Sequence, residues 1–253
     1  MRELKISSLI LSYTNGWPEQ DVEFLRDLTF LQILNLTARR PISDGAVGSL
    51  INLESLNLNS YSSDRIDFSS MRSLRVCYLA WRTSAKTIFE LTRLRRLGIS
   101  GFKGKNLTAF SSFSNLEWLN FLISPVRSLE GLAGCVILRS LRLGMLTKLE
   151  SLAGLEHNLE LEELDINTCR KVSNLAPLSH LQSLRKLYVQ NGRKIESLEP
   201  IGACRNLEDV TIEAHVRDGD LSALYELPRL RQLRIRMLPH YTGPPADTPI
   251  KFV

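Results

Sequence analysis

The sequence contains few of the residue patterns that mark metal proteins, disulfide-rich proteins or enzymes. Four cysteines occur among 253 residues, and none lies in a CxxC or metal-finger spacing. The sequence therefore predicts neither a zinc site nor a disulfide framework. No phosphate loop, dinucleotide fingerprint, nucleophile elbow or HExxH motif occurs, and these are the motifs that carry common enzyme chemistry. We expect a protein with no enzymatic activity, no cofactor and no metal.

Long apolar runs are also missing. The amino end carries Arg2 and Lys5, but Ser7 and Ser8 interrupt its apolar run and no small-residue cleavage site follows, unlike a secretory leader. No later stretch approaches the roughly 20 apolar residues that a bilayer-spanning helix needs. The sequence thus predicts a cytoplasmic protein without a membrane partner.

What the sequence does contain is a repeat. Three leucine-type residues return eleven times at offsets 0, +3 and +5, with successive trios 20 to 25 residues apart. Because side chains alternate along a strand, offsets +3 and +5 face the same side. A fixed period of this length indicates a solenoid of stacked strands, in which no repeat folds alone. The trios begin at Ile6, Leu31, Leu53, Leu74, Leu94, Leu116, Leu138, Leu161, Leu184, Leu207 and Leu230.

A second apolar series follows the strand in repeats 7 to 10, at offsets +14 and +17. A spacing of three residues is typical of a tight 3₁₀ turn rather than a long helix. Repeats 3 to 5 have short, atypical segments here, so we expect the coil to be least regular in them. The paired residues are Leu152 and Leu155, Leu175 and Leu178, Leu198 and Ile201, and Leu221 and Leu224.

This pattern resembles the leucine-rich repeat family, and residues 172–189, VSNLAPLSHLQSLRKLYV, look most like its internalin-like class with 22-residue repeats. The resemblance covers residues 4–238 and implies an α/β solenoid. The expected fold is a right-handed leucine-rich repeat coil of about eleven repeats, with a parallel sheet on the concave face and 3₁₀ or irregular turns on the convex face.

One departure from the family concerns offset +8, where an Asn side chain usually bonds the loop backbone. Of the eleven residues at this offset, only Cys169 fits the accepted Asn or Cys. The loops must therefore satisfy their backbone groups in other ways. The others are Thr14, Arg39, Tyr61, Arg82, Phe102, Ser124, Leu146, Gly192, His215 and Leu238.

The chain is expected to form a single leucine-rich repeat domain, residues 1–253. Residues 1–30 would hold the first strand and an N-terminal cap with a helix-like segment at Glu19–Leu28. Residues 31–238 would be the repeats. Residues 239–253 contain four prolines and would form a C-terminal cap or a free tail. As a cap, this segment would cover the last repeat with Tyr241, Ile250 and Phe252.

The net charge of +5 and the pI near 9.1 raise the question of nucleic-acid binding. A nucleic-acid groove should be basic throughout. At offset +1, however, the later repeats alternate strictly in sign, which on neighbouring strands gives a solvated ladder of opposite charges. We therefore expect no nucleic-acid partner. The alternating residues are Glu117, Arg139, Glu162, Arg185, Glu208 and Arg231.

The most informative positions for binding are offsets +2, +4 and +6, which point away from the core and line the concave face. They are amide-rich in the first repeats, aromatic in the middle and of mixed charge in the last repeats. Exposed Trp, Tyr and Arg are enriched at interface hot spots. We predict that a folded protein partner binds this face through Asn35, Asn57, Tyr78, Trp81, Trp118, Asn120, Arg142, Glu163, Asp165, Lys186, Tyr188, Asp209, Arg234 and Arg236.

Other interpretations stay open. By family analogy, an inhibitor or immunity-type protein is one such binder. A parallel β-helix-like carbohydrate-active enzyme would need clustered carboxylates in a cleft, and an exported adhesin would need a leader or anchor. The simplest alternative is that Trp118 and Tyr78 only cover the sheet while the charges solvate it. A homo-oligomer is also compatible with the sequence.

Overall fold

The computed structural model describes residues 6–243 and 251–252. The chain divides into two compact units, which we describe separately. Unit 1 comprises Met1–Phe102 and Ser112–Leu116, and unit 2 comprises Lys103–Ser111 and Glu117–Val253. That the whole chain is a single domain stays a prediction.

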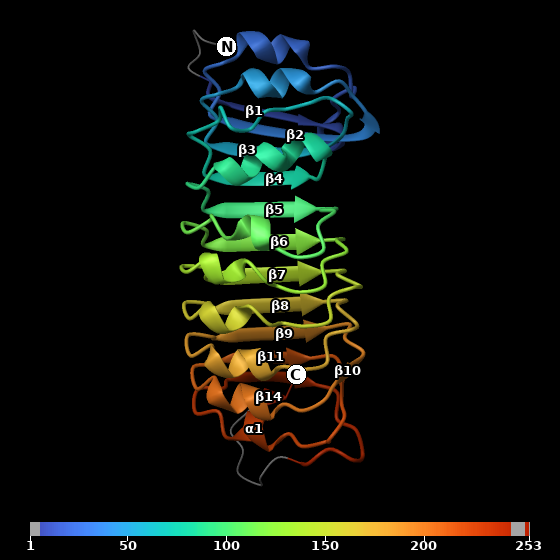
Figure 1. Cartoon of the computed structure of the whole chain (residues 1–253). Helices are drawn as coiled ribbons and strands as arrows, with labels where there is room; N and C mark the ends of the chain where they lie inside the picture. The colour runs from blue at the N-terminus through green and yellow to red at the C-terminus, as the bar shows by residue number, and fades with distance from the viewer. Residues whose placement is uncertain (1–5, 244–250, 253) are drawn as a thin grey trace. The chain divides into compact units, whose positions relative to one another are not determined.

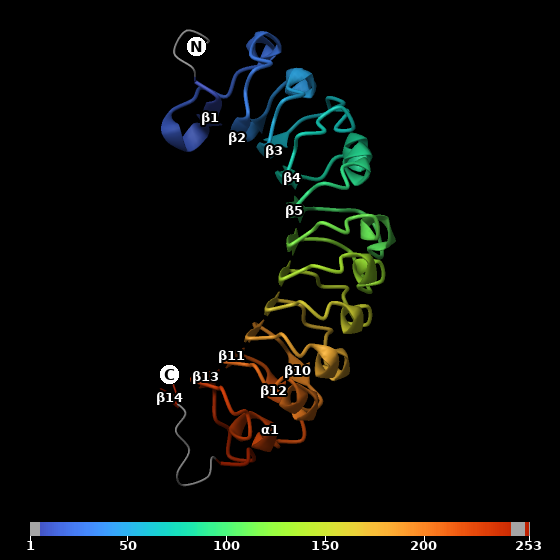
Figure 2. The ribbon, with the colours of Figure 1, turned by 90° about the vertical axis from the view of Figure 1, so that its left-hand side faces the viewer.

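Unit 1 contains a parallel sheet whose strands pair in chain order. In Figure 2 these strands lie on one side of the unit, and η2, η3 and η4 lie on the other. The strands are β1 (Ser8–Ser12), β2 (Ile33–Pro41), β3 (Ser55–Tyr61), β4 (Val76–Ala80) and β5 (Arg96–Ser100). The 3₁₀ helices are η1 (Tyr13–Asn15), η2 (Glu23–Asp27), η3 (Gly45–Ser49) and η4 (Thr83–Glu90).

Unit 2 repeats the same plan with greater regularity. Its main sheet is parallel, and its helices lie on the side opposite the strands (Figures 1 and 2). The main-sheet strands are β6 (Trp118–Leu122), β7 (Ser140–Gly144), β8 (Glu163–Asn167), β9 (Lys186–Gln190), β11 (Asp209–Ile212), β13 (Gln232–Ile235) and β14 (Lys251–Phe252). The short strands β10 (Lys194–Ile195) and β12 (His215–Val216) form a second sheet. The helices are η5 (Thr108–Phe110), η6 (Leu132–Gly134), η7 (Leu155–His157), η8 (Ala176–His180), η9 (Glu199–Ala203) and α1 (Ser222–Tyr225).

The leucine trios form the core, as predicted. In the repeat that contains β8, Leu161 and Leu164 are 0% exposed and Ile166 is 2% exposed. The second apolar series is also buried, with Leu175 and Leu178 packed around η8. Burying such a side chain contributes about 1.5–3 kcal/mol, which favours stacking one repeat on the next. The α/β solenoid of about eleven repeats is confirmed, with one main-sheet strand for each trio.

Strand pairing keeps each offset in a straight row. In unit 1, Asn35 pairs with Asn57 and Asn57 with Tyr78. In unit 2, Arg142 pairs with Asp165 and Asp165 with Tyr188. The rows that the repeat period predicts therefore exist within each unit. The connection between β3 and β4 consists of turns and irregular backbone without a 3₁₀ helix, whereas η4, which follows β4, has eight residues. This matches the irregularity expected for repeats 3 to 5.

The helix expected at Glu19–Leu28 is shorter than predicted and is a 3₁₀ helix, η2, limited to Glu23–Asp27. Glu19 has a left-handed backbone (φ 56°), and its carboxylate accepts the backbone N–H groups of Arg39 and Arg40. This contact fixes the segment against β2 before a helix can begin. Val22, Leu25 and Leu28, whose three-residue apolar spacing indicated a helix, also fit a 3₁₀ turn.

The segment after β13 folds back onto the last repeats. The hydroxyl of Tyr241 accepts the backbone N–H of Val216 at 2.8 Å, and Thr242 Oγ1 accepts that of Leu221 at 2.7 Å. Strand β14 then pairs with β13. Residues 238–242 thus pack against the end of unit 2. Of the other residues expected to cap it, Ile250 and the side chain of Phe252 lie outside the described part of the chain.

The loops replace the missing Asn residues in different ways. Cys169 at offset +8 donates its thiol to Leu143 O at 3.5 Å. In unit 1, Arg82 at offset +8 donates two hydrogen bonds to the Asp44 carboxylate, at 2.7 and 2.8 Å. Ser60 donates a third to Asp44 at 2.6 Å, and the Asp44 side chain is 0% exposed. A buried carboxylate is tolerated because it is paired and fully hydrogen-bonded.

A second carboxylate completes this polar group. Asp64 Oδ2 accepts the Ser43 hydroxyl at 2.7 Å and the N–H groups of Asp44 and Gly45 at 2.8 Å each. The Ser43 hydroxyl, followed by the Gly45 N–H, lowers the pKa of Asp64 below its ordinary value of 3.8. We call Ser43, Asp44, Ser60, Asp64 and Arg82 the Asp44 cluster.

Candidate functional site

The strand face of each unit consists of the outward side chains at offsets +2, +4 and +6. In unit 1 this face carries amides that bond to one another. Asn57 Nδ2 donates to Asn35 Oδ1 at 3.2 Å, and the Thr37 hydroxyl donates to the same oxygen at 3.2 Å. All three side chains are half-buried. The predicted amide zone is therefore an ordered row with remaining donors and acceptors for a partner.

The two aromatic residues predicted as anchors in unit 1 differ in position. Tyr78 is half-buried on the strand face and lies over Gly98, where a Cβ would come 2.5 Å from Tyr78 Cδ1. Trp81 sits at the strand exit and packs into an aromatic cluster, 4.7 Å from Phe102 and 5.9 Å from Phe89 between ring centroids. Tyr78 therefore belongs to the strand face, whereas Trp81 stabilises the loop edge of unit 1.

The strand face of unit 2 begins with Trp118 and Asn120, both half-buried on β6. Two ordered contacts follow along the rows. Arg142 donates to Glu163 at 2.9 Å as an ion pair. The Tyr188 hydroxyl donates to Asp209 at 2.8 Å, and burial together with this hydrogen bond raises the pKa of Tyr188. These contacts hold four of the predicted residues in fixed orientations.

Three cations on the same face remain available. Lys186, Arg234 and Arg236 are exposed, and none of their side chains forms a hydrogen bond or ion pair with another residue in the ranges 6–243 and 251–252. The face therefore presents internally paired charges next to unpaired positive ones. Mixed signs of this kind suit a protein partner with its own charge pattern.

A hollow of about 320 Å³ opens on this face over β7 and β8. We call it the Asp165 hollow. Asp165 Oδ1 is buried there and has no hydrogen-bond partner among the described residues. Burial raises the pKa of Asp165, while nearby Arg142 opposes the shift and Glu163 adds to it. An unpaired buried acceptor is costly, so a donor from a partner would be favoured. Residues lining the hollow include Asn120, Leu122, Arg142, Met145, Asp165 and Asn167.

The strand exits of unit 2 carry a feature that sequence reasoning missed. In four consecutive repeats, the residue at offset +7 has a left-handed backbone, with φ from 50° to 56°. These residues are Ile123, Met145, Thr168 and Asn191. Each of the first three donates its N–H to the strand of the next repeat; for example, Ile123 N–H donates to Gly144 O at 3.0 Å. The side chains of Ile123 and Met145 are consequently 55% and 46% exposed beside the strand face.

A left-handed conformation costs a branched residue such as Ile123 roughly 1–2 kcal/mol. Its presence beside the hollow is the kind of local strain that often accompanies functional surfaces. A glycine at offset +7, Gly101 in unit 1, was a signal in the sequence that the backbone at the strand exit can be left-handed, and Gly101 does have a positive φ.

The charge ladder at offset +1 forms as predicted in two places. Arg139 pairs with Glu162 and Arg185 pairs with Glu208, each at 2.7 Å. The hydrogen bond from Arg185 lowers the pKa of Glu208. Because the pairs are exposed, each contributes little to stability. They lie at offset +1 and fix side chains beside the strand face.

Within the described ranges, no three His, Cys, Asp or Glu side chains come together as metal ligands. None of the helices there combines the length and the apolar character that a membrane span requires. All four cysteines are buried, free thiols. Burial raises the pKa of Cys135 and of Cys204 to about 12 and that of Cys169 to about 11.

Comparison with known proteins identifies the fold. No protein-family model matches the sequence, and no curated protein matches it. The structure is similar to an internalin (inlF) from Listeria monocytogenes, with 19% identity and a TM-score of 0.59, covering 87% of this chain and 72% of that one. It is also similar to a leucine-rich repeat protein of Leptospira interrogans, with 18% identity and a TM-score of 0.56, covering 90% of this chain and 66% of that one.

At this identity the likeness establishes the fold alone. The chain has a leucine-rich repeat fold of the internalin type, in agreement with the sequence resemblance. It spans slightly less than two thirds of the Leptospira protein. Partner binding by the predicted strand-face residues stays a prediction.

Proposed function

We propose that this protein is a non-enzymatic binding module whose strand faces hold a folded protein partner. The observation that carries the proposal is the Asp165 hollow with its surroundings. A buried carboxylate oxygen lacks a donor among the described residues, and the exposed side chains of Ile123 and Met145 stand beside it. Trp118 begins the same face. Apolar and aromatic anchors around an unfilled polar group are typical of a protein interface.

Order on the face also supports this function. The ion pair between Arg142 and Glu163 and the hydrogen bond between Tyr188 and Asp209 hold their side chains before a partner arrives. A face arranged in advance loses less conformational entropy on binding. Unpaired Lys186 and Arg234 would then favour a partner with acidic groups opposite the later repeats.

The rival functions receive less support. A nucleic-acid groove would be basic, whereas Glu163, Asp165 and Asp209 share the face with its cations. A parallel β-helix enzyme would stack further long sheets against the first one, but the described part of the chain has 3₁₀ helices on that side and a second sheet of only two short strands. As an alternative, the same binding module would act outside the cell as an exported adhesin.

A module that acts by covering its partner's surface would serve as an inhibitor or immunity-type protein, and the partner's activity measured with and without this protein would test that role. We also propose a cytoplasmic location, for which the four free buried thiols are suitable. Cell fractionation with an antibody would test the location.

The binding proposal is tested by affinity capture with matched variants. The tagged protein is incubated with a lysate of the cell that produces it, and captured proteins are quantified by mass spectrometry. Tyr78→Ala and Trp118→Ala are each expected to weaken capture of one specific partner by about 2 kcal/mol, roughly 30-fold, because large aromatic contacts dominate interfaces.

Leu159→Ala serves as the control because Leu159 is 55% exposed but lies between η7 and β8, off the strand face. It should capture the partner as the unmodified protein does. Circular dichroism spectra of all variants should coincide. Unchanged capture by both aromatic variants would refute the strand-face proposal.

A further inference from the structure

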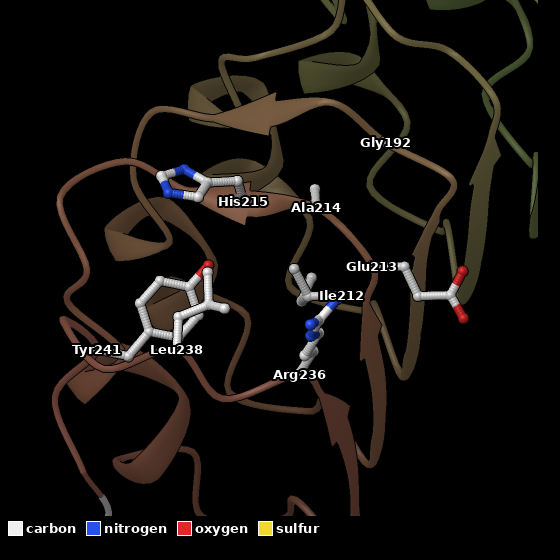
Figure 3. Close-up of a pocket in the computed structure, with 8 residues that line it drawn as sticks. All are labelled: Gly192, Ile212, Glu213, Ala214, His215, Arg236, Leu238 and Tyr241. Atoms are coloured by element: carbon white, nitrogen blue, oxygen red, sulfur yellow. The ribbon is translucent and has the colours of Figure 1, made fainter.

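A second cavity lies at the margin of the strand face, where β9, β11 and β13 end, and Arg236 of that face lines it (Figure 3). Its volume is about 360 Å³, at the lower end of the roughly 300–1,000 Å³ found for small-molecule pockets. We call it the Tyr241 pocket. Its walls include Gly192, Ile212, Ala214, Arg236, Leu238 and Tyr241.

The pocket exists because of the residues at offset +8. Gly192, His215 and Leu238 occupy this offset in three consecutive repeats, and all three line the pocket. An Asn at offset +8 would place an amide in the loop, but Gly192 places no side chain there. A Cβ at Gly192 would lie 2.9 Å from the Cβ of Ala214, so even an alanine would crowd this wall.

The walls are held in place by hydrogen bonds and ring contacts. The Tyr241 side chain is fixed by the bond from Val216 N–H to its hydroxyl, and the residue is 8% exposed. His240 packs edge-on against the Tyr241 ring at 4.6 Å and stacks on His215 at 5.1 Å. These contacts fix the shape of this side of the pocket.

Two charged side chains line the pocket, Arg236 and Glu213. Figure 3 shows the Arg236 guanidinium beside Ile212, and it shows Glu213 extending away from Tyr241 and Leu238. Glu213 also accepts the Asn191 N–H at 3.3 Å. The Arg236 side chain is exposed and forms no hydrogen bond or ion pair with another residue in the described ranges. An apolar cavity with one free guanidinium suits an apolar group that carries an anion.

We propose that the Tyr241 pocket binds the C-terminal residue of a partner polypeptide. A bulky apolar side chain of that residue would fill the space between Ile212, Leu238 and Tyr241, and its terminal carboxylate would pair with Arg236. An arginine pairs well with a carboxylate because its planar fork can donate two parallel hydrogen bonds. This site goes beyond the proposed function, since it shares only Arg236 with the predicted strand-face residues and binding in it does not require Tyr78 or Trp118.

The test uses N-acetyl-phenylalanine as the probe, because it carries the aromatic group and the carboxylate of a chain terminus. Titration of the ¹⁵N-labelled protein should shift the amide signals of Gly192, Ala214 and His215, with a Kd of about 1 mM for a ligand of this size. N-acetyl-phenylalaninamide lacks the charge, and N-acetylglycine lacks the ring. Each should bind at least about threefold more weakly.

Two variants separate the pocket from general surface charge. Arg236→Gln should reduce affinity for the acid to that for the amide, whereas Arg229→Gln, which replaces an exposed arginine that does not line the pocket, should leave it unchanged. Gly192→Leu should abolish binding by filling the pocket, with the circular dichroism spectrum as a check of folding. Arg236→Gln replaces an exposed side chain and keeps the test valid if Gly192→Leu misfolds.

Equal affinity for the acid and the amide would overturn the inference, as would shifts that Arg236→Gln leaves intact or no shifts at these amides. None of these outcomes bears on capture through Trp118 and Tyr78. Failure of the pocket and failure of the strand-face proposal are therefore distinguishable.

Discussion

Two regions of this molecule place acidic residues beside an arginine, and they use them differently. In the Asp44 cluster of unit 1, Arg82 and Ser60 satisfy the Asp44 carboxylate, and three donors converge on one oxygen of Asp64. In the Asp165 hollow of unit 2, Arg142 pairs with neighbouring Glu163 instead, and Asp165 keeps one buried oxygen without a donor among the described residues.

The difference distinguishes a structural polar group from a binding one. A satisfied cluster replaces the missing Asn at offset +8 and holds loops together, so its removal should affect stability. An unsatisfied carboxylate in a hollow does not stabilise the fold, and it leaves hydrogen-bonding capacity for a partner. The pKa of Asp64 is lowered and that of Asp165 is raised, which is the titration signature of the same contrast.

The largest expected effect comes from breaking the Asp44 cluster. Arg82→Ala leaves the Asp44 carboxylate buried without its counter-charge and should lower the free energy of unfolding by about 3–5 kcal/mol. The control is Arg139→Ala, which breaks the exposed pair with Glu162 and should cost less than about 1 kcal/mol. Urea denaturation measures both. Similar losses for the two variants would show that the cluster is not a structural core.

The second prediction concerns Asp64. Asp64→Ala should lower the free energy of unfolding by about 1–3 kcal/mol at neutral pH, because the Ser43 hydroxyl and two backbone N–H groups lose their charged acceptor. The folded-state pKa lies below the ordinary 3.8, so this contribution is present above pH 3.8 and is lost as the pH falls through the folded pKa. Denaturation at a series of pH values should show the difference from the unmodified protein shrinking in acid. A difference that stayed constant would contradict this role.

Asp165→Asn should act in the opposite direction and more weakly. The pKa of Asp165 in the folded protein is raised above the ordinary 3.8. The charged carboxylate therefore begins to destabilise the fold as the pH rises past 3.8, and the effect is complete above the folded pKa. The variant should be more stable above the folded pKa by less than about 1 kcal/mol, since the side chain is only half-buried. The gain should disappear below pH 3.8. The same pH series measures it, and a loss of stability at neutral pH would show that Asp165 has a donor after all.

The smallest change is expected at the strand exit. Ile123→Asn should raise the free energy of unfolding by about 0.5–1 kcal/mol, because Asn tolerates the left-handed backbone that strains isoleucine. Ile137→Asn is the matched control, since Ile137 is 37% exposed and has no positive φ. Thermal unfolding compares the two. Ile123→Asn should also weaken partner capture, and equal effects of the two substitutions would remove the argument for strain.

The rows of side chains on the sheet could be predicted from the sequence, but the contacts and cavities beside them could not. The leucine period alone predicts that Arg142, Asp165 and Tyr188 stand side by side, because the core fixes the register of every strand. It does not predict that Arg82 reaches Asp44, since that contact joins two irregular loops 38 residues apart. Nor does it reveal the left-handed turn at Met145, because backbone conformation at a strand exit depends on hydrogen bonds to the next strand.

The pairing pattern of unit 2 has a mechanical consequence. From β6 to β9, and on through β11 to β13, each main-sheet strand pairs with the strand of the next repeat. A force applied at one end would therefore detach one rung at a time. Each detached rung would free about 22 residues of chain, or roughly 75 Å at full extension. Under load, unit 2 would lengthen in even steps instead of failing at once.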